Sequence, residues 1–200
     1  MIDTIIFDFG DIFINLDKQA TISGLQNLGM TEWNTKLDRL NLLFETGDIS
    51  YDDFLAGFQK ELPNASIEEI LKAWNAVLAD FPLYRLEFLQ LLSQKYRLFL
   101  LSNTDSIHIA TFENASGISF YSDFYQCFEK VYFSFEIGMR KPNPEVFQYL
   151  INKHELSPKR TLFVDDKKEN TDSAAALGFH VWNLQVGQED VIDLFDKKIL

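Results

Sequence analysis

The chain has 200 residues, a net charge of −12 and a single cysteine, Cys127. This length suits one domain, or a domain with a large insertion, and such a chain can bury about 70% of its unfolded surface. One cysteine excludes an internal disulfide, and the strong negative charge disfavours nucleic acid and anionic membranes as partners. The sequence shows no signal peptide and no apolar run long enough to cross a bilayer, so we expect a cytoplasmic protein without a membrane partner.

The first predicted element is a buried strand at 3–9, an apolar stretch interrupted near its end by Asp8. Gly10 and Asp11 follow directly. A buried strand gains nothing from a carboxylate at its end. Asp8 is therefore either a cap of the following turn or part of a reactive site, and the residue alone leaves both interpretations open.

The interval 16–84 contains no convincing strand. Ser50 and Ser66 are each followed three residues later by an acid, the pattern with which many helices begin, and apolar residues then recur at helical spacing. We therefore expect a helical insertion over the carboxyl edge of the sheet, where open α/β folds bind ligands. The predicted division is a helical cap at 16–84 and an α/β core formed by 1–15 and 85–200.

The rest of the chain alternates between apolar strands and amphipathic helices. The later strands are predicted at 96–102, 130–135, 160–166 and 180–184. One helix is expected at 143–155, with Asn143 as its N-cap and Pro144 at its first position, and another at 169–179, where Gly178 suits a helix end. The strands are apolar throughout, which is typical of strands covered on both faces. The sequence therefore predicts an α/β fold with a doubly wound parallel sheet.

Polar residues follow four of the predicted strands or lie just beyond them. They are Asp8, Ser102 with Asn103, Lys141, and Asp165 with Asp166. Because the carboxyl ends of parallel strands share one edge, we expect these side chains to meet in one crevice. Two carboxylates about 4.5 Å apart, at an effective dielectric of about 20, repel each other by about 3–4 kcal/mol, so three of them require protons or a cation. Hard oxygen ligands favour Mg²⁺ as that cation.

These motifs resemble those of the haloacid dehalogenase-like hydrolases, in the subgroup with a helical cap after the first strand. The resemblance covers nearly the whole chain. It rests on "FDFG" around Asp8, "LSNT" at 101–104, "GMRKP" at 138–142 and "VDD" at 164–166. Within the family, the sequence is similar in particular to bacterial sugar-phosphate phosphatases of the α-D-glucose-1-phosphate type.

The resemblance implies a Mg²⁺-dependent phosphatase that works in two steps. Asp8 would attack phosphorus to form an aspartyl phosphate, which water would then hydrolyse. Lys141 would bridge Asp8 and the transferring group, and Ser102 and Asn103 would bind that group. The substrate would be a small phosphorylated metabolite, with a sugar phosphate as one candidate.

The resemblance also implies the residues that hold Mg²⁺. They would be Asp8, the backbone carbonyl of Gly10, and the acidic pair. Asp166 would bind the ion directly, whereas Asp165 would be either a ligand or a partner behind the ligands. Adjacent side chains of a regular strand point to opposite faces, so both acids reach the ion only if the strand ends there.

The sequence departs from the family at Gly10. Most phosphatases of the family carry a second Asp there, which protonates the leaving oxygen. Three explanations are open: Asp11 takes over this role, the leaving group needs little protonation, or the protein binds phosphate without turnover. General acid–base catalysis typically contributes about 10²–10⁴-fold, so a slow enzyme could survive its loss.

Two alternative functions follow from these observations. A non-catalytic protein that binds phosphate and metal, or another protein, on the same scaffold would explain Gly10. A 2-haloacid dehalogenase is disfavoured, because the dehalogenases of the family use no metal and lack the pair Asp165–Asp166. The sequence identifies neither the substrate nor the oligomeric state, and it leaves open whether Trp33, Phe44, Glu45 or Trp74 faces the crevice.

Overall fold

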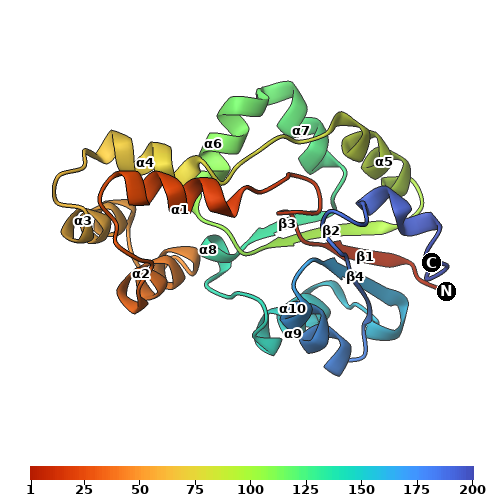
Figure 1. Ribbon diagram of the computed structural model, residues 1–200. Helices are drawn as coiled ribbons and strands as arrows, with labels where there is room; N and C mark the ends of the chain where they lie inside the picture. The colour runs from red at the N-terminus through yellow and green to blue at the C-terminus, as the bar shows by residue number, and fades with distance from the viewer.

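The computed structural model describes all 200 residues and has a five-stranded parallel sheet at its centre (Figure 1). The strand order is β3-β2-β1-β4-β5, and every neighbouring pair is parallel. The strands are Thr4–Phe7 (β1), Arg97–Ser102 (β2), Lys130–Phe133 (β3), Thr161–Asp165 (β4) and His180–Asn183 (β5). The chain starts in the middle of the sheet, runs to one edge and then to the other. This is the doubly wound arrangement, so the predicted fold class is confirmed.

Helices cover both faces of this sheet (Figure 1). One face packs against α5 (Leu83–Ser93), α6 (Ser106–Ser116) and α7 (Ile118–Gln126), and the other against α9 (Pro144–His154) and α10 (Lys168–Ala176). Ile5 and Phe7 of β1 belong to the hydrophobic cluster on the first face, whereas Ile6 belongs to the cluster on the second. Successive side chains of a strand point to opposite faces, so covering both faces explains why the strands are apolar throughout.

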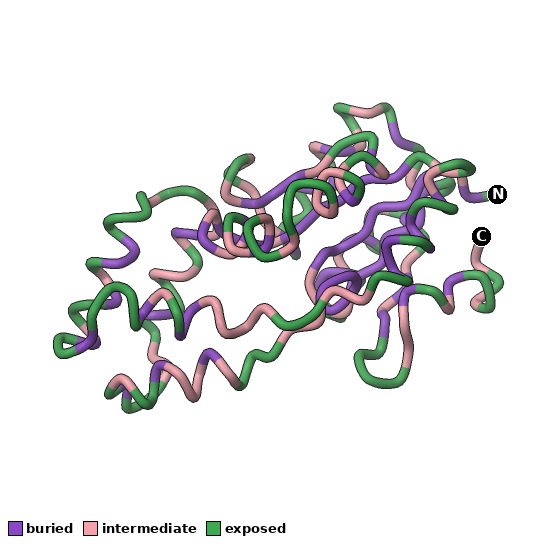
Figure 2. Tube along the Cα trace, turned by 90° about the horizontal axis from the view of Figure 1, so that it is seen from above, coloured by how far each residue is buried: buried purple, intermediate pink, exposed green.

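The central strands run in step. Thr4 of β1 pairs with Arg97 of β2 on one side and with Thr161 of β4 on the other. The carboxyl ends of the three strands therefore lie side by side, and the residues that leave those ends begin from one edge of the sheet. Figure 2 shows that the buried residues concentrate along these strands.

Five helices lie between β1 and β2 in the chain, and the first four of them form a separate lobe (Figures 1 and 2). They are α1 (Lys18–Asn27), α2 (Thr35–Glu45), α3 (Tyr51–Glu61) and α4 (Ile67–Asn75). Ser50 and Ser66 cap α3 and α4 as the sequence predicts, and Ser66 forms a full capping box. A second hydrophobic cluster of 13 buried residues joins the lobe to Ile107 of α6, and in it Phe54 stacks on Phe44 at 4.1 Å between ring centroids. The division into a cap at 16–84 and a core stays a prediction.

The short helix α8 (Ser134–Ile137) follows β3, and 3-10 helices at Pro158–Arg160 and Val191–Phe195 complete the structure. Gly178 has a φ of 89° after α10, as expected of a residue that ends a helix. Asn143 stands at the N-cap of α9, but its side chain makes no capping hydrogen bond. No helix combines the length and apolar character that crossing a membrane requires.

Candidate active site

A buried ammonium group joins the ends of two neighbouring strands. Asp8 follows β1, Asp165 is the last residue of β4, and the Nζ atom of Lys141 lies 2.7 Å from a carboxylate oxygen of each. The same ammonium donates a third hydrogen bond, also of 2.7 Å, to the carbonyl oxygen of Leu101 at the end of β2. Lys141 is 1% exposed, so all three of its donors are used inside the protein. Three strands are thus tied together at one point.

The backbone of Lys141 is held by Asn103. The Asn103 amide nitrogen donates to the Lys141 carbonyl oxygen at 2.7 Å, and the Lys141 backbone N–H donates to the Asn103 amide oxygen at 2.9 Å. The Ser134 hydroxyl bonds to both the N–H and the carbonyl oxygen of Thr104, which fixes β3 against the end of β2. The Asn103 side chain therefore positions the lysine, and its predicted contact with phosphate stays a prediction.

The two adjacent acids of the "VDD" motif differ in environment. The Asp165 carboxylate is fully buried, and besides Lys141 it accepts hydrogen bonds from the Lys167 backbone N–H at 2.8 Å and from the Asn170 amide at 2.9 Å. The Asp166 side chain keeps 10% of its surface exposed and lies 3.8 Å from the Lys18 ammonium. Asp165 is thus committed to protein donors, whereas Asp166 keeps its oxygens available.

The three acids fit a divalent cation. One carboxylate oxygen each from Asp8, Asp165 and Asp166 can be chosen so that all three lie within 4.8 Å of one another. Gly10 lines the same small cleft of about 60 Å³ as Asp8 and Asp166. Hard anionic oxygens at this spacing are the donor set that Mg²⁺ prefers.

The electrostatics of the cluster also favour a cation. Burial raises the pKa of Asp8 to about 7, and the charges of Asp165 and Asp166 add to this effect, although Lys141 opposes it. Burial and the neighbouring Asp165 likewise raise the pKa of Asp166. Burial alone would lower the pKa of Lys141, but the charges of Asp165 and Asp8 outweigh it and raise that pKa. The ammonium therefore stays charged, and a divalent ion would keep Asp8 ionised.

The cleft opens into a chamber of about 160 Å³ beneath the helical lobe, and Gly10, Leu16 and Asn103 line both spaces. The Ser102 residue at the end of β2 lines this chamber. The sequence left open which of four residues in 16–84 faces the crevice, and of these Glu45 lines the chamber. Trp33 and Trp74 line a neighbouring space of about 250 Å³ instead, and Phe44 lies in the hydrophobic cluster of the lobe.

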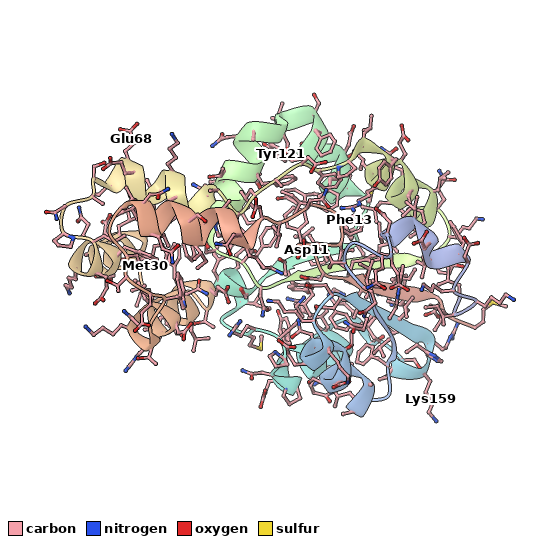
Figure 3. All side chains as sticks on the ribbon, in the orientation of Figure 1. Asp11, Phe13, Met30, Glu68, Tyr121 and Lys159 are labelled. Atoms are coloured by element: carbon pink, nitrogen blue, oxygen red, sulfur yellow. The ribbon has the colours of Figure 1, made fainter.

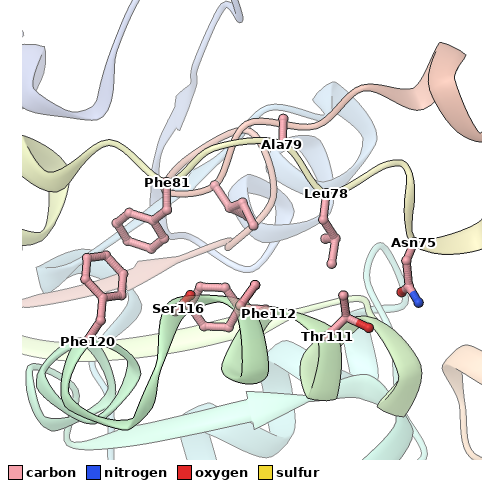
Figure 4. Close-up of a pocket in the computed structure, with 10 residues that line it drawn as sticks. Asn75, Leu78, Ala79, Phe81, Thr111, Phe112, Ser116 and Phe120 are labelled. Atoms are coloured by element: carbon pink, nitrogen blue, oxygen red, sulfur yellow. The ribbon is translucent and has the colours of Figure 1, made fainter. Parts of the chain in front are cut away.

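A further cavity, of about 340 Å³, lies between α6, α7 and the segment that follows α4 (Figure 4). Phe81, Phe112 and Phe120 gather toward one end of it, and Asn75 and Thr111 lie toward the other. None of the predicted site residues lines this cavity. We therefore place the candidate active site in the smaller polar cleft.

The sequence did not single out His108, which lines the chamber from α6. Its Nδ1 atom lies 2.9 Å from an Asp105 carboxylate oxygen, and its Nε2 atom lies 3.1 Å from the carbonyl oxygen of Trp74. Both partners are acceptors, so only the doubly protonated ring satisfies them. Burial would lower the pKa of His108, but the bond to Asp105 outweighs it and raises that pKa. The spacing Asp-x-x-His at a helix start was the signal available.

The profile of the haloacid dehalogenase-like hydrolases matches residues 5–184 of this sequence. The chain belongs to this family. The predicted family and the predicted enzyme class, a hydrolase of this family, are therefore confirmed, and the match spans the sheet and the helical lobe alike.

Three relatives resemble this chain along most of its length. It is 28% identical to a D-ribitol-5-phosphate phosphatase of Bacteroides thetaiotaomicron, over 94% of this chain and 95% of the relative. A solved HAD family enzyme of B. thetaiotaomicron, in complex with magnesium and inorganic phosphate, is 33% identical, with 94% and 97% of the two chains covered and a TM-score of 0.85. A predicted HAD-like hydrolase of Porphyromonas gingivalis is 28% identical, covers 98% and 97%, and has a TM-score of 0.85.

Proposed function

We propose that this protein is a Mg²⁺-dependent phosphomonoesterase that forms an aspartyl phosphate on Asp8. The observation that carries the proposal is the convergence at one sheet edge of Asp8, Asp165 and Asp166 around the buried Lys141 ammonium. These residues are distant in sequence, and the repulsion between their carboxylates is relieved by the binding of a cation, whose positive charge also attracts a phosphate. The phosphatase names of the relatives support the same reaction class.

In the first step, an Asp8 carboxylate oxygen attacks phosphorus and the alcohol leaves. Lys141 holds Asp8 at 2.7 Å and neutralises charge on the transferring group, and the Ser102 hydroxyl donates to a phosphoryl oxygen. In the second step, water attacks the aspartyl phosphate and releases inorganic phosphate. Catalysis then rests mainly on positioning and on charge neutralisation.

Asp8, the Gly10 carbonyl and Asp166 would hold Mg²⁺, which supplies positive charge to the phosphoryl oxygens when it is bound. Asp165 would not bind the ion directly but would contact the residues around it. Its hydrogen bonds from Asn170 and the Lys167 backbone orient its carboxylate toward Lys141, so its role is to position the lysine. This assignment separates the two acids that the sequence left open.

The substrate we propose is a small phosphorylated metabolite with hydroxyl groups, a sugar or polyol phosphate. The chamber next to the cleft offers the polar side chains of Glu45, Ser102 and Thr104 to such a molecule. The relative named for D-ribitol 5-phosphate supports a polyol as the first compound to test. We further propose that residues 16–84 act as a cap that covers this chamber, while 1–15 and 85–200 form the core. Location in the cytoplasm stays a prediction.

Phosphate release tests the proposal. Purified protein is assayed with a panel of phosphorylated metabolites, including D-ribitol 5-phosphate, with Mg²⁺ and with EDTA. We expect Mg²⁺-dependent release that Asp8→Asn abolishes for every substrate. Asp172→Asn is the matched control, because Asp172 is an exposed acid paired with Lys168 on the surface of α10. Release by Asp8→Asn at the wild-type rate would refute the nucleophile.

Two other results would redirect the assignment. Binding of the phosphate mimic beryllofluoride without turnover of any panel member would favour the non-catalytic protein that Gly10 suggests. Halide release from a 2-haloacid without Mg²⁺ would favour a dehalogenase.

A further inference from the structure

The loop after β1 offers no free acid to protonate the leaving group, either at Gly10 or at Asp11. Gly10 has no side chain, and a Cβ atom there would lie 2.7 Å from the Cδ1 atom of Leu16, so any side chain at this position would require Leu16 to move. The Asp11 carboxylate is 7% exposed and already accepts two hydrogen bonds. The Leu16 backbone N–H donates to it at 3.0 Å and the Lys18 ammonium at 2.9 Å. The leaving-group side of the cleft therefore lacks a free acid from this loop.

What the loop provides instead is the ammonium of Lys18. Lys18 is the first residue of α1, and it lines the same cleft as Asp8 and Gly10. Asp11, labelled in Figure 3 at the junction of the helical lobe and the sheet, holds its Nζ atom, which also lies 3.8 Å from Asp166. The buried Asp11 carboxylate thus holds the Lys18 ammonium in the cleft that contains the nucleophile Asp8.

The other ammonium groups of the cleft are less suited to this position. Lys141 spends all three donors on Asp8, Asp165 and the Leu101 carbonyl. Lys167 is exposed like Lys18, but no protein acceptor holds its ammonium, because only its backbone N–H is bonded, to Asp165. His108 lines the chamber, but both of its ring nitrogens face protein acceptors. Lys18 alone combines a fixed position in the cleft with a partly open surface, its side chain being 59% exposed.

We propose that Lys18 binds the leaving-group oxygen of the substrate and stabilises the negative charge that develops on it, in place of the acid absent at Gly10. The proposal rests on the phosphatase activity proposed above. It assigns a catalytic contact to α1, so that the helical lobe contributes to the chemistry and not only to substrate selection.

An Asp8 oxygen forms the new bond to phosphorus while the bond from phosphorus to the leaving oxygen breaks. The electron pair of that bond stays on the leaving oxygen, which the Lys18 ammonium binds. This oxygen then takes up a proton from the ammonium or from an adjacent water. The proposal requires the positive charge and the hydrogen bond, and it requires no particular pKa of Lys18.

The test compares two leaving groups in the wild type and in Lys18→Met. D-ribitol 5-phosphate releases a poorly stabilised alkoxide, whereas p-nitrophenyl phosphate releases a phenolate that needs little help. We expect Lys18→Met to lower kcat/KM for the alkyl ester by about 10²–10³-fold, the usual cost of removing one donor to a developing oxyanion. For the aryl ester, kcat/KM should fall by less than about tenfold, because the phenolate needs little stabilisation as it leaves. Lys18→Arg, which keeps the charge, should recover part of the loss.

Two lysine variants serve as comparisons. Lys168→Met removes an exposed charge paired with Asp172 on α10 and should change neither substrate's kinetics. Lys167→Met tests the third lysine of the cleft, besides Lys18 and Lys141, and its effect should not depend on the leaving group. Calorimetric titration with Mg²⁺ verifies that Lys18→Met still binds the cation, so that lost metal is not mistaken for lost catalysis.

An equal loss for both esters would overturn the proposal, because it would mean that Lys18 only holds α1 to the loop through Asp11. A leaving-group dependence that appears in Lys167→Met instead would overturn it as well. Both results leave the proposed phosphatase intact, since the wild type still releases phosphate. A wild type that releases phosphate from neither ester would overturn the proposed function and this inference together.

Discussion

Gly47 allows the helical lobe to pack closely against α8, the short helix after β3, and replacing it should be costly. It follows α2 with a φ of 72°, and a Cβ atom on it would lie 2.3 Å from the backbone carbonyl oxygen of Phe135 in α8. A side chain in this left-handed conformation costs about 1–2 kcal/mol, and overpacking against a backbone atom adds about 1–3 kcal/mol. Gly47→Ala should therefore lose about 2–5 kcal/mol, a large part of the roughly 5–15 kcal/mol that stabilises a domain.

Urea unfolding measures this loss, and Gly187→Ala provides the matched control. Gly187 has a similar φ of 79°, but no atom lies within 4 Å of its added Cβ. That variant should lose only the conformational part, about 1–2 kcal/mol. The difference between the two variants isolates the contact with Phe135. If both variants lose the same free energy of unfolding within about 0.5 kcal/mol, the close approach of the lobe to α8 is refuted.

Two further predictions concern the residues around the site. Folding raises the pKa of His108, with Asp105 and Glu45 as the acids that face the ring, so the charged ring contributes its full stability below the pKa of the unfolded chain and loses it as the pH rises through the pKa of the folded protein. Tm measured from pH 5.5 to 8.5 should therefore fall more steeply in the wild type than in His108→Gln. Parallel curves of Tm against pH would contradict this. Asn170→Ala should lower kcat about 10–100-fold because Asp165 loses the amide that orients it; Asp172→Ala on the same helix is the control, and a kcat within about twofold of wild type would count against the positioning role.

The strands and the site motifs could be predicted from the sequence because they are local patterns. All five strand segments were found within a few residues, since continuous apolar runs between turn signals have few other interpretations. Asp8, Lys141 and the acidic pair lie near the ends of strands or in linear motifs, and the in-step register of β1, β2 and β4 brings them together. The parallel topology alone was enough to infer this meeting.

The direction of individual side chains could not be predicted in the same way. Asn170 lies near the start of the helix predicted at 169–179, a position that suits an exposed residue as well as a partner of an acid. In the structure Asn170 is 2% exposed and bonds to Asp165. Both ends of the Asn103 amide bond to the Lys141 backbone, a contact that the sequence does not indicate, whereas the predicted contact of Asn103 with phosphate stays a prediction. Such contacts depend on loop paths that no periodicity encodes.

The position of Lys18 is even harder to predict from the sequence. It lies ten positions after Asp8, at the start of a helix in the lobe, where a lysine usually faces solvent. Only the turn at Asp11, a non-glycine residue with a φ of 58°, brings this helix start back to the cleft. A sequence pattern that marks such a return would have to combine the strand end, the turn and the helix start.

The central claim is that acids distant in sequence meet around one divalent ion, with Asp8 as the nucleophile. A crystal structure of the protein with Mg²⁺ and beryllofluoride tests it most directly. We expect beryllium bonded to an Asp8 carboxylate oxygen, with Mg²⁺ bound by Asp8, Asp166 and the Gly10 carbonyl, and with Lys141 beside the fluorides. Beryllofluoride bonded to a different residue, or Mg²⁺ bound away from these three ligands, would contradict it.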